Sequence, residues 1–429
     1  MSPNSGPAEK LALLGGQKTI PSAFAKYNPI GKEELAAAQK VIQSGVLSQF
    51  IGAWHEDFYG GPKVREFEKA AADYFGVKHA VTVNSWTSGL VAAVGAIGLE
   101  PGDEVITTPW TMCATATAIL HWNGIPVFAD IDPETYNLDP KSIEKNITPF
   151  TRAIMVADIF GQSADMDEIM KLAERHNLKV ISDTAQAPGA LYQGHFAGTF
   201  AHVGGYSLNY HKHIHTGEGG ILVTNDDGIA ERLQLIRNHA EAVVEAKKVQ
   251  NISNMLGHNF RLGELECAIG IEQLKKLGGL VKSRQDLAAA LSEGLQGLPG
   301  LSTPVVRSDR THVYYVYPMK LEVGQISVTR DRVCDALNAE GVDISRRYQN
   351  IHLLPVYQRK IAFGSQGFPW TSDICRRPIS YNKGICPIAE KLNDSEFLGL
   401  NLCAYDINCK DIDLVIKAFK KVWASLATL

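Results

Sequence analysis

The sequence has no excess of basic residues. Its 46 acidic residues outnumber its 42 lysines and arginines, which gives a formal net charge of −4, and charges of one sign do not gather in long runs. Proteins that bind membrane surfaces, or nucleic acids without sequence specificity, usually present a basic face. We therefore expect neither a nucleic-acid partner nor a membrane partner.

Long apolar runs are also missing. The longest lies around residues 90–99, well short of the roughly 20 apolar residues that a membrane-spanning helix needs. The first residues, MSPNSGPAEKLALLGG, contain no basic segment followed by an apolar one, so no secretory signal is visible. These absences predict a cytoplasmic protein.

Cysteine and histidine patterns give no sign of a metal site. The seven cysteines form no C-x-x-C pair and are odd in number, so neither a zinc site nor a disulfide framework is predicted. Three histidines, His211, His213 and His215, alternate in YSLNYHKHIHTGEGG. No acidic or thiol partner stands out beside them, and we predict no metal.

What the sequence does contain is enough apolar material for a large core. A chain of 429 residues, 45% of them hydrophobic, is expected to form two or three domains. From about residue 65 to 225, short apolar runs alternate with helix-like segments such as TSGLVAAVGAIGL and DMDEIMKLAERHN. This alternation predicts an α/β fold whose mostly parallel sheet is covered on both faces. The predicted strands are HAVTVN (79–84), EVITTP (104–109), IPVFADI (125–131), RAIMVADIF (152–160), KVISD (179–183), VGGYSLN (203–209) and GGILVTN (219–225).

A second, smaller domain is predicted after residue 295. The segment 261–295 has helical periodicity and stops at LPGLSTP, which we interpret as a hinge. Beyond it come a strand pattern, HVYYVYPMKL, a helix around DRVCDALNAEG and a final amphipathic helix, DIDLVIKAFKKVWASL. We predict an N-terminal arm at 1–35, a large cofactor-binding domain at 36–295 and a small C-terminal domain at 296–429.

Polar and aromatic residues follow several predicted strands, at the edge where an open α/β sheet binds its ligand. A lysine there can form a Schiff base with an aldehyde, and a carboxylate can keep a pyridine nitrogen protonated. Hydroxyls at a helix N-terminus can receive a phosphate, and an aromatic face can pack on a ring. The set therefore indicates pyridoxal 5'-phosphate. Its members are Thr87, Ser88, Trp110, Asp183, Gln186, Ser207, Asn209 and Lys212.

Seven longer stretches agree in order and spacing with one known family, over roughly residues 10–275 and more weakly to the end. They are NSWTSGL, PGDEVITTPWTMCATATAI, FADIDPETYNLD, FGQSADMDEI, VISDTAQAPGA, YSLNYHKHIHTGEGGILVTND and GHNFRLGELECAIGIEQL. In these the chain resembles the DegT/StrS-type sugar aminotransferases, which have the aspartate aminotransferase fold (fold type I). The resemblance implies a large domain with a seven-stranded, mostly parallel sheet and a smaller α+β C-terminal domain.

The resemblance also implies roles for the matching residues. Lys212 would be the Schiff-base lysine, and Asp183 the partner of the pyridine nitrogen of pyridoxal 5'-phosphate, with pyridoxamine 5'-phosphate as an intermediate. Gln186 would lie near the ring hydroxyl and Trp110 would stack on the ring, although a tryptophan there also suits the core. A neighbouring subunit would complete the site, which implies a homodimer with shared active sites. The implied phosphate ligands are Thr87, Ser207 and Asn209, with Asn259 and Arg261 from the neighbour.

Two stretches depart from the family pattern. Trp86 stands where the family usually has glycine, at the tight turn before the phosphate-binding helix. A bulky residue does not readily take a positive φ, so we expect either a different turn or a Trp86 side chain directed at the bound molecules. The stretch LSQFIGAWHEDFYGGPKVREFE is longer than usual, so Trp54 lies either in the substrate pocket or in a solvated loop. The other candidates for substrate contact are His211, Tyr348 and His352.

The implied activity is transfer of an amino group from glutamate or glutamine to a keto sugar, linked to a nucleotide, or to a keto-cyclitol. A sugar dehydratase is the alternative within the family, but relatives with that activity carry histidine at the position of Lys212. A non-catalytic regulatory protein that binds the cofactor is the alternative from another class. No DNA-binding module or basic face supports it.

Overall fold

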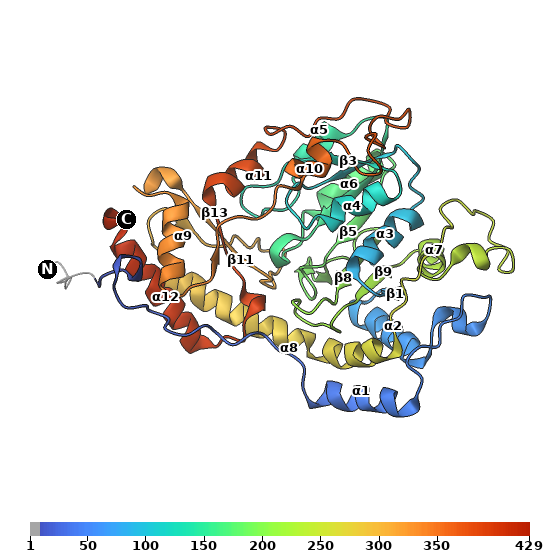
Figure 1. The fold of residues 1–429 in the computed structure, drawn as a ribbon, viewed down its shortest axis with the longest axis horizontal. Helices are drawn as coiled ribbons and strands as arrows, with labels where there is room; N and C mark the ends of the chain where they lie inside the picture. Colours follow the sequence, from blue (N-terminus) through green and yellow to red (C-terminus); the bar gives the residue numbers. More distant parts are fainter. Residues whose placement is uncertain (1–8) are drawn as a thin grey trace.

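The structure of the protein, a computed structural model, describes residues 9–429. Its centre is a seven-stranded sheet in the order β1-β9-β8-β5-β4-β2-β3 (Figure 1). Neighbouring strands pair in parallel except at β9, which runs antiparallel to β1 and to β8. The predicted α/β fold with a mostly parallel sheet is therefore confirmed. The strands are β1 (His79–Val83), β2 (Glu104–Thr107), β3 (Ile125–Phe128), β4 (Thr151–Ala157), β5 (Lys179–Asp183), β8 (Val203–Ser207) and β9 (Gly220–Thr224).

Helices cover both faces of the sheet. On one face, α3, α4 and α7 share a continuous apolar cluster with the strands. On the other face, α2 and α8 cover the half that contains β1, β9 and β8, and α5 and α6 cover the half around β4, β2 and β3. This double cover explains why the strands are continuous apolar runs in the sequence. The helices are α2 (Pro62–Phe75), α3 (Trp86–Ala96), α4 (Ala114–His121), α5 (Pro140–Asn146), α6 (Met166–Arg175), α7 (Asp227–Arg237) and α8 (Glu264–Leu295).

A second, four-stranded antiparallel sheet has the order β10-β11-β13-β12. Together with α9, α12 and the C-terminal end of α8 it encloses its own apolar core. In the described part of the chain, no helix combines the length and the apolar character that crossing a bilayer requires. The elements here are β10 (Leu301–Ser302), β11 (Tyr317–Leu321), α9 (Arg330–Ala339), β12 (Ile344–Ser345), β13 (Phe397–Leu400) and α12 (Cys409–Ala424). Two short helices, α10 (Pro355–Gln358) and α11 (Pro387–Lys391), pack instead on the apolar cluster around β4, β2 and β3.

Helix α8 belongs to both cores. It has 32 residues and runs along the molecule from α2 to α12 (Figure 1). Leu274 and Leu277 pack in the cluster that includes α2, β8 and β9, whereas Leu291 and Leu295 pack with the four-stranded sheet. One unbroken helix therefore joins the two sheets, and the boundary placed at residue 295 stays a prediction.

The segment before α1 (Lys32–Ser44) packs on the four-stranded sheet and its helices. Leu11 and Ile20 are buried in that core. The carboxylate of Glu340, which is fully buried, accepts hydrogen bonds from the backbone N–H groups of Ala12 at 2.7 Å and Thr19 at 3.0 Å, and from Lys421 Nζ at 2.9 Å. The first described residues are thus tied to the end of the chain.

Glycines in β8 allow an unusually close approach of neighbouring groups. A Cβ added at Gly204 would lie 2.1 Å from the carbonyl oxygen of Gly198. A Cβ added at Gly205 would lie 2.1 Å from the carbonyl oxygen of Ile221 and 2.4 Å from the indole ring of Trp86. The pair in VGGYS is therefore needed for packing, and the Trp86 ring lies directly against β8.

We expect Gly205→Ala to destabilise the protein by about 1–3 kcal/mol, because the methyl group overlaps backbone and ring atoms that cannot all withdraw. Gly279→Ala is the matched control, since this exposed glycine lies inside α8 and a Cβ there meets nothing within 4 Å. It should raise stability by up to about 1 kcal/mol through helix propensity. Urea unfolding followed by circular dichroism checks both values, and equal effects of the two substitutions would contradict this account.

Candidate active site

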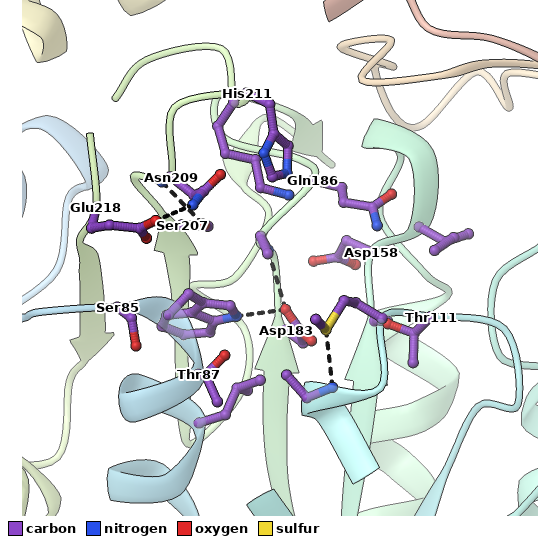
Figure 2. Close-up of a pocket in the computed structure, with 18 residues that line it drawn as sticks. Ser85, Thr87, Thr111, Asp158, Asp183, Gln186, Ser207, Asn209, His211 and Glu218 are labelled. Carbon is purple, nitrogen blue, oxygen red and sulfur yellow. Dashed lines mark hydrogen bonds between the residues drawn. The ribbon is translucent and has the colours of Figure 1, made fainter. Parts of the chain in front are cut away.

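The carboxyl ends of β4, β5 and β8 open into a pocket of about 170 Å³ (Figure 2). Its walls also include the N-terminus of α3 and the loop before α4. Larger hollows exist on the surface, among them one of about 760 Å³ beside Lys320 and Glu322, but chemistry rather than size identifies the site. The polar residues of the smaller pocket include most of those predicted from the sequence: Thr87, Asp183, Gln186, Ser207, Asn209, His211 and Lys212.

Lys212 is the one amine among the pocket-lining residues, and only 7% of the residue is exposed. Its backbone N–H donates to the carbonyl of Asn209 at 2.9 Å, in the turn after β8. Burial lowers the pKa of the Lys212 ammonium to about 8, although nearby Asp183 and Cys403 act in the opposite direction. Nζ lies 4.3 Å from the centre of the Tyr315 ring. Roughly a tenth of this amine is therefore neutral, and nucleophilic, at pH 7, a far larger share than in a lysine with the ordinary pKa.

Asp183 is the last residue of β5 and is 6% exposed. One carboxylate oxygen accepts a hydrogen bond from Trp86 Nε1 at 2.6 Å, and the other accepts one from Thr115 Oγ1 at 2.7 Å. Two donors from two different helices thus fix the carboxylate. Thr115 was not identified from the sequence, where it is one of two threonines in CATATA.

A second carboxylate lies at the end of the neighbouring strand. Asp158 follows β4 and is almost fully buried. It accepts hydrogen bonds from Thr184 Oγ1 at 2.7 Å, from the Ala164 N–H at 2.9 Å and from Ser182 Oγ at 3.1 Å. Burial raises the pKa of Asp158 to about 6, while these donors favour its anion. The sequence analysis missed Asp158, whose place one strand away from Asp183 follows from the pairing of β4 with β5.

The N-terminus of α3 forms one side of the pocket. Ser85 caps the helix by accepting the N–H of Ser88 at 3.1 Å. Thr87 and, from the end of β8, Ser207 also line the pocket. A helix N-terminus with hydroxyls beside it suits a phosphate group.

Asn209 lines the same pocket. Its Nδ2 donates to Glu218 Oε1 at 2.8 Å, and its Oδ1 is buried without a hydrogen-bond partner among the described residues. A buried polar atom without a partner is rare in folded proteins and fits a site that receives a polar ligand.

Gln186 connects the pocket to the second part of the molecule. Its Oε1 accepts the Phe160 N–H at 2.9 Å, and its Nε2 donates to the Tyr348 hydroxyl at 3.0 Å. Burial raises the pKa of Tyr348 to about 12, so this hydroxyl stays protonated and able to donate. Tyr348 therefore approaches the site behind Gln186 without lining the pocket.

The structure corrects the assignment of Trp110. Its side chain is fully buried and packs against Tyr136, Phe160 and Phe397 rather than facing the pocket. Two residues later, Met112 lines the pocket and is 56% exposed. The loop after β2 is irregular, so side-chain directions in it do not follow from a strand or helix period. A flexible, polarisable thioether can also cover a ring face.

Trp86 takes up ordinary helical geometry. It is the first residue of α3, without a positive φ, so the tight turn does not strain it. The residue is 6% exposed and lines the pocket, where its indole is held against Gly205 and Gly89. Of the two alternatives, the side chain is directed into the site.

The remaining substrate candidates divide into one inside and two outside the pocket. His211 lines the pocket and is exposed. Trp54 lies on the surface, with Lys247 Nζ 5.1 Å from its ring centre, and does not line the pocket. His352 is fully buried, and its Nε2 lies 3.0 Å from Glu390 Oε1, so the structure contradicts a substrate contact for it.

Asn259 and Arg261 do not line the pocket of their own chain. Asn259 is exposed, and its carbonyl accepts a hydrogen bond from Asn84 Nδ2 at 3.3 Å. Nε of Arg261 is buried and has no hydrogen-bond partner within residues 9–429. Their contribution to the site of a neighbouring subunit stays a prediction.

The residues present fit the cofactor that the sequence indicated. A buried amine, a fixed carboxylate and a helix N-terminus with hydroxyls face one cavity. These are the groups that an aldehyde, a pyridine nitrogen and a phosphate require. The apolar wall for the ring comes from Met112 and Trp86 and not from Trp110.

Known proteins resemble this chain over most of its length. Residues 30–394 match the model of the DegT/DnrJ/EryC1/StrS aminotransferase family. GDP-perosamine synthase of Caulobacter vibrioides is 38% identical over 69% of this chain and 79% of its own length. L-glutamine:2-deoxy-scyllo-inosose aminotransferase of Streptomyces lividus is 33% identical over 83% of this chain and 86% of its own length.

A solved structure shows the same fold. DesV of S. venezuelae, determined in complex with a ketimine intermediate, superposes with a TM-score of 0.75 at 30% sequence identity. The match covers 91% of this chain and 94% of that one. The likeness therefore extends over nearly the whole chain.

Replacing Lys212 by Met should stabilise the ligand-free protein at pH 7, because an ammonium group is no longer buried. The folded-state pKa of about 8 lies below the ordinary 10.5. The wild-type unfolded state therefore binds more protons between these values, and wild-type stability rises with pH across that window. We expect a gain on the order of 2–3 kcal/mol at pH 7 that shrinks towards pH 10.5.

Urea unfolding at pH 7 and at pH 10 checks this expectation. Lys40→Met is the control, since Lys40 is exposed on α1 and should show no such pH dependence. A Lys212→Met protein with wild-type stability at both pH values would contradict the expected cost of burying the Lys212 ammonium.

Proposed function

Because the chain belongs to the DegT/DnrJ/EryC1/StrS aminotransferase family, we propose that it moves an amino group from glutamate or glutamine to a ketone on a sugar or a cyclitol. The protein is a pyridoxal-phosphate-dependent aminotransferase, in line with its family and with the solved relative. The observation on which the proposal rests is the buried amine of Lys212 in one pocket with the fixed carboxylate of Asp183.

Lys212 is proposed as the catalytic residue. When bound, the cofactor supplies an aldehyde that exchanges amino groups and a protonated ring that accepts electron density. The burial that leaves the Lys212 amine partly neutral makes it suited to hold that aldehyde. Once free, the same amine is the group in the pocket able to take up and return the proton of the reacting carbon.

Other residues of the pocket are proposed to bind and orient. Asp183 would face the ring nitrogen, since its carboxylate is buried and already fixed by two donors. Thr87 and Ser207 would hold the phosphate together with the N–H groups at the start of α3. Gln186, held by Phe160 and Tyr348, would lie along the ring edge.

The dehydratase alternative is not favoured. In the family, histidine at the lysine position accompanies loss of a sugar hydroxyl, and this chain has lysine there. The neighbouring His211 lines the pocket but does not replace the amine. It stays available as a substrate contact.

The acceptor is proposed from the relatives. GDP-perosamine synthase points to a nucleotide-linked keto sugar, whereas the inosose aminotransferase points to a keto-cyclitol and to glutamine as donor. The inosose enzyme matches 83% of this chain against 69% for the perosamine enzyme. This longer match favours testing keto-cyclitols alongside nucleotide-linked keto sugars.

A homodimer with shared active sites is also proposed. Helix α1 and the segment after it expose large apolar side chains: Leu35 at 68%, Ile42 at 61% and Leu47 at 54%. Exposed apolar clusters on a soluble surface mark places where partners bind. Arg261 and Asn259 are available for a second copy, because neither lines the pocket of its own chain.

The enzyme loaded with pyridoxal 5'-phosphate should transfer labelled nitrogen from glutamate or glutamine to at least one keto sugar or keto-cyclitol. Lys212→Ala should lower turnover by a factor of at least about 10³, since it removes both the binding amine and the proton carrier. Borohydride treatment and mass mapping should place the cofactor adduct on the peptide that contains Lys212.

The control is Lys40→Ala, which should keep wild-type turnover because Lys40 is exposed on α1. Full activity of Lys212→Ala, or an adduct on another lysine, would refute the catalytic assignment. If no nitrogen is transferred to either acceptor class, the proposed substrates are refuted. The role of Lys212 is then still tested by where the borohydride adduct is found.

Replacing Leu35 and Ile42 together by Glu should shift the protein from a dimer to a monomer in light scattering. The charges would have to be buried without partners in the proposed interface. Arg261→Ala should leave the dimer intact and weaken cofactor binding, because its guanidinium is proposed to reach the neighbouring phosphate. A wild-type protein that is monomeric at all concentrations would contradict the shared site.

A further inference from the structure

Trp86 contacts the one carboxylate that the proposed chemistry depends on. Its indole Nε1 donates to Asp183 Oδ1 at 2.6 Å, and both residues are 6% exposed. Figure 2 draws hydrogen bonds to the Asp183 carboxylate as dashed lines among the residues that line the pocket. Hydrogen bonds to an ionised acceptor are short and roughly twice as strong as neutral ones, and this one is short.

The contact leaves room for a further donor. A carboxylate offers about four lone-pair sites. At Asp183 one is used by Trp86, one by Thr115 and one by the Ala185 N–H at 3.3 Å. Trp86 therefore does not compete with a ring nitrogen for Asp183. Instead, its N–H compensates for part of the hydration that the buried carboxylate has lost.

Trp86 is also held in place by the surrounding backbone. Its position as the first residue of α3 sets the direction of the side chain, and the ring lies against β8 where Gly205 has no Cβ. On the α3 side, a Cβ added at Gly89 would lie 2.8 Å from the indole, so the ring packs closely on both the helix and the strand. The donor is thus presented by a rigid part of the fold.

We propose that Trp86 is a positioning residue that holds the Asp183 carboxylate in place and aimed at the ring nitrogen of the cofactor. The inference rests on the proposed role of Asp183. It gives a function to the tryptophan that stands where the family usually has glycine. A simple space-filling role is the competing explanation, because the indole also contributes to the apolar cluster between α3 and the sheet.

Trp122 provides a matched control. It belongs to the same apolar cluster, is 9% exposed and also donates its indole N–H, to the carbonyl of Val91 at 2.7 Å. It does not line the pocket. Trp122→Phe therefore removes a comparable buried ring and hydrogen bond without touching Asp183.

The first experiment measures the dissociation constant of pyridoxal 5'-phosphate from the ligand-free protein by equilibrium dialysis. Trp86→Phe should weaken binding about tenfold or more, as expected for loss of a donor to a charged group, and Trp122→Phe should change it less than about twofold. In an Asp183→Asn background, the change in log Kd caused by Trp86→Phe should be less than half of the change that it causes in the wild-type background. Equal effects in both backgrounds would show a space-filling role and overturn the proposal.

The second experiment needs no cofactor. The chain has six tryptophans, so the ligand-free protein labelled with ¹⁵N-tryptophan gives at most six indole N–H signals. The signal that Trp86→Phe removes should move in Asp183→Asn, whereas the signal that Trp122→Phe removes should stay. If Trp86→Phe fails to fold, the Asp183→Asn protein still decides: no shift of any indole signal overturns the proposal.

The two ideas fail in different ways. Asp183→Asn with wild-type cofactor affinity refutes the proposed role of Asp183 itself. Weakened affinity in Asp183→Asn together with wild-type affinity in Trp86→Phe refutes only the role of Trp86.

Discussion

Burial of the Lys212 amine beside the Asp183 carboxylate is the constraint on which the site depends. Removing an ammonium group from water favours its neutral form, whereas the nearby carboxylate favours the charged form. Burial has the larger effect, and the pKa of Lys212 falls to about 8. The carboxylate stays in place because it has donors of its own. An amine suited to attack a carbonyl and an acceptor suited to a protonated ring can thus coexist in one cavity.

The sheet makes this combination possible. Asp183 pairs with Ala157 on β4 and with Gly205 on β8, so residues far apart in the chain end at one edge. Lys212 is brought there by the turn that follows β8. The helix N-terminus of α3 meets the same edge from the side. Parallel pairing, and not any local stretch, places the polar groups together, as expected for open α/β sheets.

The sequence allowed the seven strands to be predicted, together with the gathering of Lys212, Asp183 and the start of α3 at one edge of the sheet, because apolar runs and strand ends are encoded locally. It did not allow the direction of side chains in loops to be predicted. Trp110 was expected in the pocket and lies in the core, whereas Met112 takes the exposed place. Thr115 and Asp158 were missed because their contacts to the site come from neighbouring elements. His352 was misplaced for the same reason, since Glu390 binds it from 38 residues away.

The attachment of residues 11–20 to the four-stranded sheet has a consequence for how the polypeptide can be divided. Leu11 and Ile20 complete a core whose other members come from the last third of the chain and from α8. Glu340, buried at its edge, would lose its two backbone donors from the N-terminal side if those residues were removed. A carboxylate deprived of such donors in an apolar setting is strongly unfavourable. The core around the four-stranded sheet is therefore built from separate parts of the chain. An expression fragment that starts at residue 296 lacks the N-terminal residues and the end of α8 that complete this core.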